Sequence, residues 1–127
     1  MPAVDFPGRR KLIEALDAAV AQPDTAQVMR ALRDALCRMI RSSDVALPAC
    51  TQECCSDHYA RRELYRSDEH GYCVVAMTWG PGQGTPIHDH SGMWCVEGVW
   101  RGALDVVQYE LLEHDATRYR FRPAGAI

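Results

Sequence analysis

The sequence predicts a mainly β protein with helices at its amino terminus, arranged as a small antiparallel β-barrel or jelly roll with the helices packed at one side. Apolar residues recur at helical spacing in the first third of the chain, and strand-like segments follow. Helices first and antiparallel strands after favour this arrangement. The 127 residues suffice for one domain with a hydrophobic core, but not for two.

Two amphipathic helices are expected in the first third. The first spans residues 9–21, and Pro23 ends it. Asp24 is a good N-cap for the second helix, which has Gln27 as a capping-box partner and runs to about Ile40. The apolar stripes expected to form core contacts are Leu12, Ile13, Leu16, Ala19 and Val20, then Val28, Leu32, Ala35, Leu36, Met39 and Ile40.

The pattern then changes to strands. The expected strands are residues 61–65, 72–79, 93–100, 103–111 and 119–122. A polar turn at residues 67–71 joins the first two into a hairpin, and Arg101-Gly102 joins the next two into a second. We therefore divide the chain into a helical segment, residues 1–44, packed on the amino-terminal part of a barrel, residues 45–127, within one domain.

Composition and charge exclude several classes of function. The formal net charge is −3, and no cluster of Lys or Arg indicates nucleic acid or an anionic membrane as a partner. No apolar run is long enough to span a bilayer, and residues 1–10 lack the apolar stretch of a signal peptide. The six cysteines are therefore expected to be reduced thiols in a cytoplasm. Cys50, Cys54 and Cys55 lack the spacing of a zinc site, so we expect ordinary thiols there.

Two histidines give the strongest functional signal. His88 and His90 follow a Gly/Pro-rich turn at residues 80–86. In a strand, residues i and i+2 point to the same face, so both imidazoles can reach one metal ion. The alternative is a pair of surface histidines in a loop, but the glycine turn and the flanking apolar residues favour a metal site.

The residues around this pair resemble the first conserved motif of the cupin superfamily. The pattern runs Gly82-x5-His88-x-His90-x4-Cys95-x6-Gly102. Most cupins carry Glu where this chain has Cys95, and a Cys there is similar to the thiol dioxygenase branch, specifically the cysteine dioxygenase family.

The resemblance extends outward from the histidines. Residues 79–90 resemble the central block of that family, and residues 59–64 resemble the segment that carries its substrate-binding arginine. The resemblance covers about residues 59–111 and implies a cupin-type jelly-roll barrel. It also implies a cytoplasmic Fe(II)-dependent enzyme that oxidises L-cysteine with O2 to cysteine sulfinate. The alternatives are 3-mercaptopropionate or another small thiol as substrate, a zinc or manganese cupin isomerase, and a noncatalytic cupin that binds a metal or small ligand.

Five residues take roles from this resemblance. His88 and His90 match two of the family's three iron-binding histidines. Arg62 matches the arginine that binds the substrate carboxylate, for which a guanidinium is suited, with Tyr59 as a second substrate-binding residue. Family members that act on 3-mercaptopropionate carry Gln at this position, so Arg62 favours L-cysteine. Cys95 matches the cysteine that animal members link to a tyrosine, and is the candidate catalytic residue; a small core side chain is the alternative.

The family's third histidine ligand has no counterpart here. It belongs to the second cupin motif, expected after the strand near Arg120, and His58, His70 and His114 lack its motif context. Three explanations stay open: the chain lacks the carboxy-terminal part of a longer protein, Glu97 completes the ligand set, or the chain is a noncatalytic cupin. A half-barrel would expose sheet edges, so we expect further chain or a partner subunit, as in a homo-oligomer, to close it.

Overall fold

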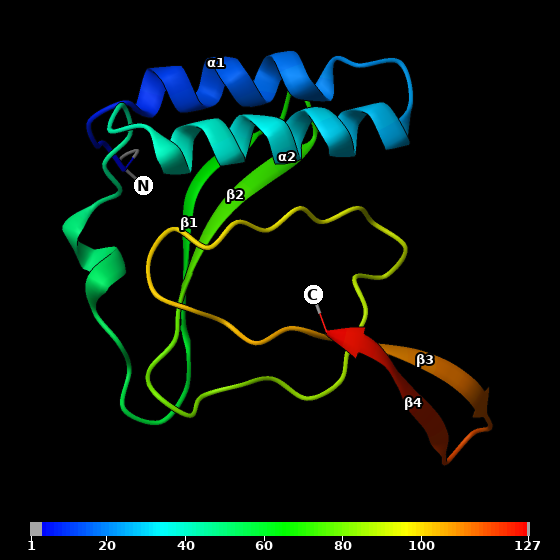
Figure 1. Cartoon of the computed structure of the whole chain (residues 1–127). Helices are drawn as coiled ribbons and strands as arrows, with labels where there is room; N and C mark the ends of the chain where they lie inside the picture. Colours follow the sequence, from blue (N-terminus) through cyan, green and yellow to red (C-terminus); the bar gives the residue numbers. More distant parts are fainter. Residues whose placement is uncertain (1–3, 127) are drawn as a thin grey trace.

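The computed structural model describes residues 4–126, which form two α-helices and two small antiparallel sheets (Figure 1). The elements are α1 (Arg9–Val20), α2 (Thr25–Arg41), the 3-10 helix η1 (Ala49–Gln52), β1 (Ala60–Ser67), β2 (Tyr72–Thr78), β3 (Val107–His114) and β4 (Tyr119–Ala126). The expected order of helices before antiparallel strands is confirmed. The described residues, 4–126, are however a mix of helix and strand rather than mainly β, and their strands close no barrel. Residues 1–3 of the predicted helical segment and residue 127 of the predicted barrel segment lie outside the described part.

Both helices form where the sequence predicts them. The carboxylate of Asp24 accepts a hydrogen bond from the Gln27 backbone N–H at 2.8 Å, which confirms the N-cap of α2. The second hydrogen bond of the predicted capping box, from the Asp24 backbone N–H to the Gln27 side chain, does not form. The Gln27 Oε1 atom is buried and has no hydrogen-bond partner. Gly8 precedes α1 with φ +85°, and a Cβ there would lie 2.7 Å from the Val45 Cα atom. Only glycine allows this close approach.

One hydrophobic core joins the helices to the first hairpin. Both helices cover the same face of β1 and β2 (Figure 1). The buried core residues are Phe6, Leu12, Leu16, Ala19, Val28, Leu32, Ala35, Met39, Val45, Leu64 and Tyr72. The Tyr72 hydroxyl donates to the Asp17 carboxylate at 2.7 Å, which links β2 to α1. Within residues 4–126, neither helix is long and apolar enough to cross a membrane.

The first predicted hairpin is confirmed. β1 pairs antiparallel with β2, and a bulge shifts the register between Glu63 and Tyr65. Before the bulge, Ala60 is buried, so Arg62 shares its face by strand alternation and is half-buried. Arg61 lies on the opposite face and is exposed.

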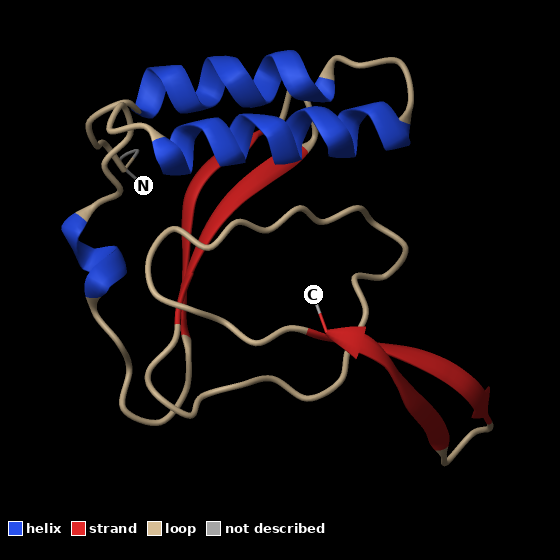
Figure 2. Cartoon of the chain, in the orientation of Figure 1, coloured by secondary structure: helices blue, strands red, loops and turns tan. Residues whose placement is uncertain are grey.

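The second predicted hairpin is wrong. Residues 79–106 contain neither helix nor strand, and we call them the long loop (Figure 2). The strand expected at residues 93–100 does not form, and β3 pairs instead with β4. The physical reason is the competing turn at Asp115, whose carboxylate accepts from the backbone N–H groups of Thr117 and Arg118 at 2.8 Å. These hydrogen bonds hold the pKa of Asp115 below its usual value.

The β3–β4 hairpin has one apolar and one charged face. Tyr109, Leu111 and Phe121 share a face by strand register, and the opposite face carries ion pairs from Glu110 to Arg122 and from Glu113 to Arg120. Every residue of both strands is exposed. The apolar face therefore has no cover among residues 4–126.

Candidate metal centre

The long loop is hydrogen-bonded near both ends to η1 and to the segment that follows it. The Gly80 backbone N–H donates to the Gln83 side-chain oxygen at 2.6 Å, and the Gln83 amide nitrogen donates to the Cys55 carbonyl at 2.8 Å. At the other end, the Arg101 guanidinium donates to the Gln52 side-chain oxygen at 2.6 Å. These contacts fix the positions of both ends of the long loop relative to the first half of the chain.

The middle of the loop packs under α2. Val96 and Trp100 are half-buried against the core. Between them, a Cβ added to Gly98 would lie 2.8 Å from the Ile40 Cδ1 atom and 3.7 Å from the Leu36 Cβ atom. The loop backbone at Gly98 therefore lies close to α2. A larger residue at this position would push the loop away from the helix.

A tight turn precedes this packed stretch. The Met93 N–H donates to the His90 carbonyl at 3.0 Å, and Ser91 and Gly92 between them have φ values of 56° and 75°. Two consecutive positive φ angles are typical of a type I′ turn, which reverses the chain. The Asp89 carboxylate accepts from the Ser91 N–H at 3.1 Å and supports the turn. Sequence reasoning missed this turn, although the Ser-Gly pair is a recognised signal for one.

The turn brings three possible metal ligands together. One ligand atom each from His90, Cys95 and Glu97 lies within 4.8 Å of the others, and the Cys95 Sγ atom lies 4.0 Å from a Glu97 carboxylate oxygen. Cys95 and Glu97 are two residues apart, and the half-buried Val96 between them points to the core. All three possible ligands are exposed.

His88 lies beside this group. The ring centroids of His88 and His90 are 5.4 Å apart, with an angle of 78° between the planes. The His88 Nδ1 atom lies 2.9 Å from the Pro86 carbonyl, which can only accept, so a hydrogen bond there has Nδ1 as its donor and leaves Nε2 as the ring atom that a metal ion would bind. The prediction that both histidines share a β-strand is wrong, because both lie in the long loop, which has no partner strand. Their proximity comes from local turns instead.

The surroundings of Cys95 favour the protonated thiol over the thiolate. Partial burial of the sulfur raises the pKa of Cys95, and the nearby Glu97 carboxylate and Cys73 thiol raise it further. A metal ion would have to displace this proton. Binding that uses the Cys95 sulfur is therefore expected to strengthen as the pH rises.

The predicted substrate-binding residues lie on and before β1. The Arg62 guanidinium donates to the Glu53 carbonyl at 2.8 Å and to the Thr78 hydroxyl at 3.3 Å. The Tyr59 ring stacks on Trp79, with centroids 4.5 Å apart. Among the residues described, no hydrogen bond joins Arg62 or Tyr59 to the possible metal ligands. The structure therefore places His88 beside His90, but only His90 joins the group formed with Cys95 and Glu97, and no hydrogen bond links the predicted substrate residues to any of them.

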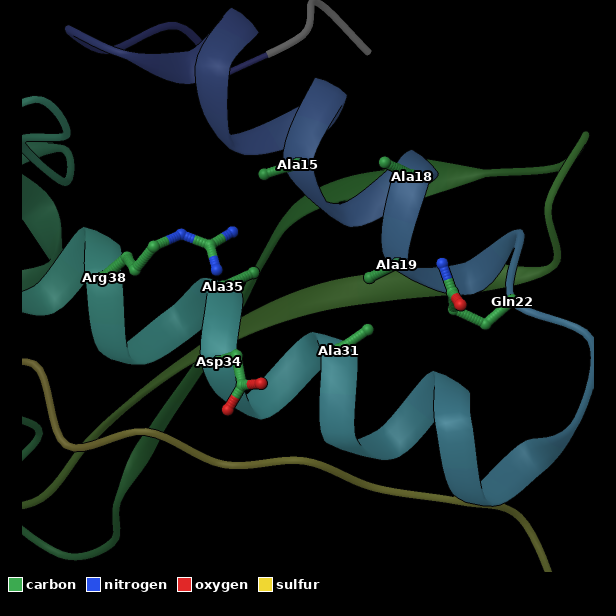
Figure 3. Close-up of a pocket in the computed structure, with 8 residues that line it drawn as sticks. All are labelled: Ala15, Ala18, Ala19, Gln22, Ala31, Asp34, Ala35 and Arg38. Carbon is green, nitrogen blue, oxygen red and sulfur yellow. The ribbon is translucent and has the colours of Figure 1, made fainter.

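Two hollows of the structure lie elsewhere. An open groove of about 250 Å³ runs between α1 and α2 (Figure 3). It is lined by Ala15, Ala18, Ala19, Gln22, Ala31, Asp34, Ala35 and Arg38. A second open hollow, of about 560 Å³, lies at the tip of the β3–β4 hairpin. Neither is lined by a predicted site residue, so neither is a substrate pocket for this centre.

Comparison with known proteins adds no assignment. No protein-family model matches the chain, and no solved structure matches it. The resemblance to cysteine dioxygenases therefore depends on the motif residues alone.

Proposed function

We propose that this chain contributes the metal centre of an Fe(II)-dependent thiol dioxygenase that oxidises L-cysteine to cysteine sulfinate. The observation that carries the proposal is the gathering of two imidazoles, a thiol and a carboxylate within residues 88–97. The spacing of these residues is also the one that resembles the cupin motif.

The residue types in this part of the loop suit a ferrous ion. Two imidazoles and one carboxylate form the ligand set of many non-haem iron oxygenases. His88 presents its Nε2 lone pair, and His90 lies beside it. The third ligand is Glu97 or a histidine from further polypeptide. When bound, the iron supplies the redox chemistry by which both atoms of O2 are added to a thiol, RSH + O2 giving RSO2H.

Arg62 is suited to hold the substrate carboxylate. Its two observed hydrogen bonds use only part of the guanidinium, which has five N–H donors. These bonds also fix the side chain on β1, so little rotamer entropy would be lost on binding. We assign Tyr59 to the same substrate-binding side and Cys95 to the metal side.

A cupin-type barrel is part of the same proposal. The apolar face formed by Tyr109, Leu111 and Phe121 is exposed, and both hairpins have unpaired edges. Further strands, from additional chain or a partner subunit, would cover this face and enclose the metal.

The alternative is a noncatalytic metal-binding protein. The exposure of His88, His90, Cys95 and Glu97 favours it, because oxygenase centres are normally shielded from water. The two proposals differ in what iron does once it is bound.

Anaerobic loading with Fe(II), followed by L-cysteine and O2, tests the proposal. The expected result is consumption of O2 with formation of cysteine sulfinate, measured by mass spectrometry.

For Arg62→Gln we predict a KM for cysteine raised at least ~10-fold with unchanged iron content, because one charged hydrogen bond contributes about 1.5–3 kcal/mol. If the protein binds iron but consumes no O2 with any small thiol, the dioxygenase proposal is wrong and the noncatalytic alternative is favoured.

A further inference from the structure

We infer that the long loop binds a thiophilic divalent cation, such as Zn²⁺, through His90, Cys95 and Glu97. This ligand set uses Cys95 in place of the His88 proposed for iron. Because His90, and Glu97 where it serves as the third iron ligand, belong to both sets, the two ions would compete for the loop. The inference concerns the same loop but does not require the dioxygenase activity.

The geometry needs little change to close around an ion. One ligand atom from each of the three residues lies within 4.8 Å of the others. With zinc–ligand bonds of about 2.0–2.3 Å, tetrahedral ligands lie roughly 3.3–3.8 Å apart. The required movement is about 1 Å, and the three exposed side chains can make it without disturbing the core.

The backbone already holds these ligands on one side. The turn at Ser91 and Gly92 reverses the chain after His90. The packing of Val96 against the core then leaves its two neighbours, Cys95 and Glu97, facing outward. Much of the ordering that a metal site requires is therefore present before the ion binds.

The chemistry of the ligands selects the ion. A thiolate favours Zn²⁺ and similar soft ions over Mg²⁺ or Ca²⁺, and imidazole also suits zinc. The two anionic ligands, Cys95 and Glu97, balance the charge of a divalent cation. Three protein ligands leave a fourth position for solvent, as in many catalytic zinc sites.

Titration of the full metal-free chain with Co²⁺ alone tests the inference. Cobalt substitutes for zinc, and a thiolate ligand gives it an intense near-ultraviolet charge-transfer absorption. We expect this band to saturate at about one equivalent of Co²⁺ and to disappear on addition of Zn²⁺. Wild-type protein without the band would overturn the inference.

Variants locate the ligands. Cys95→Ser should abolish the band, while the matched control Cys73→Ser should keep it. His90→Ala should weaken Co²⁺ binding by more than ~10-fold, since even loss of a ligand's hydrogen-bond partner costs about 10–100-fold. The control His114→Ala should bind as wild type does. A band that survives in Cys95→Ser would show that another thiol binds the ion and would overturn the assignment.

The two proposals fail in different ways. Loss of the cobalt band in Cys95→Ser together with an inactive iron-loaded wild type would support this inference and refute the dioxygenase. An active iron-loaded protein that shows no cobalt band would refute this inference alone.

Discussion

The two halves of the molecule differ in where their side chains lie. Residues 4–78 contain the whole buried core, whereas no residue from 79 to 126 is buried. The possible metal ligands belong to the second half, and they are held in place by turns and by a few contacts to the first. Stability and chemistry are therefore separated along the chain, as expected for binding residues in regions of low local stability.

The comparison also shows that an apolar strand face becomes buried only where another element covers it. Apolar alternation in β1 and β2 leads to burial because two helices cover one face. Similar alternation in β3 and β4 produces a hairpin whose apolar face stays exposed. Residues 93–100 have strand-like composition but no partner, and they pack against α2 as irregular chain.

The largest effect is expected in the core of the first half. Leu12 is 1% exposed, so Leu12→Ala should lower the free energy of unfolding by about 2–5 kcal/mol through lost burial and a cavity. The matched control is Leu111→Ala in β3, where the side chain is 46% exposed and the loss should stay within about 0.5 kcal/mol. Urea unfolding followed by circular dichroism measures both. Equal losses would contradict the division into two halves.

A smaller effect is expected where α1 meets β2. Tyr72→Phe removes the hydrogen bond to Asp17 and should cost about 1.5 kcal/mol at neutral pH. Burial, and then this hydrogen bond, raise the pKa of Tyr72. The folded state therefore favours the protonated phenol. This stabilisation is fully present below pH ~10, where an unfolded tyrosine keeps its proton, and is lost as the pH rises through the folded pKa.

Alkaline unfolding provides the check. Between pH 7 and about pH 11, wild-type stability should fall more steeply than that of Tyr72→Phe, so that the difference between them narrows. Parallel curves would show that Tyr72 does not titrate differently in the folded state.

The smallest effect is expected where the two halves touch. A Cβ at Gly98 would meet the mobile end of Ile40, so Gly98→Ala should cost about 1 kcal/mol and weaken metal binding by shifting the loop. Gly84→Ala is the control, because nothing lies within 4 Å of its Cβ position, and it should be neutral or slightly stabilising. Isothermal titration with Co²⁺ compares the two variants. Equal affinities would show that the packing against α2 does not position the ligands.

The fold of the first half could be predicted because its signals are local. Helical periodicity, the Asp24 cap and the turn before β2 each act over a few residues. The pairing in the second half depends on which segments compete for a partner. The Asp115 turn decided that competition, and period-two patterns alone do not rank such alternatives.

Candidate site residues could be chosen from the sequence, but their geometry could not be predicted from it. The His-x-His spacing and Glu97 could be chosen from ligand chemistry. Their arrangement required the positive φ angles at Ser91 and Gly92, which turn His90 toward Cys95. The sequence pattern predicted a strand for the two histidines because period-two spacing does not show whether another strand is available to pair with it.

Anaerobic Fe(II) binding by the full chain tests the central claim most directly. We predict about one ferrous ion per wild-type chain, with loss of iron in His88→Ala and in His90→Ala. His114→Ala, whose ring stacks on Tyr119 in the distant hairpin, should keep its iron. Stoichiometric iron retained by both His88→Ala and His90→Ala would contradict a metal centre built on these two histidines.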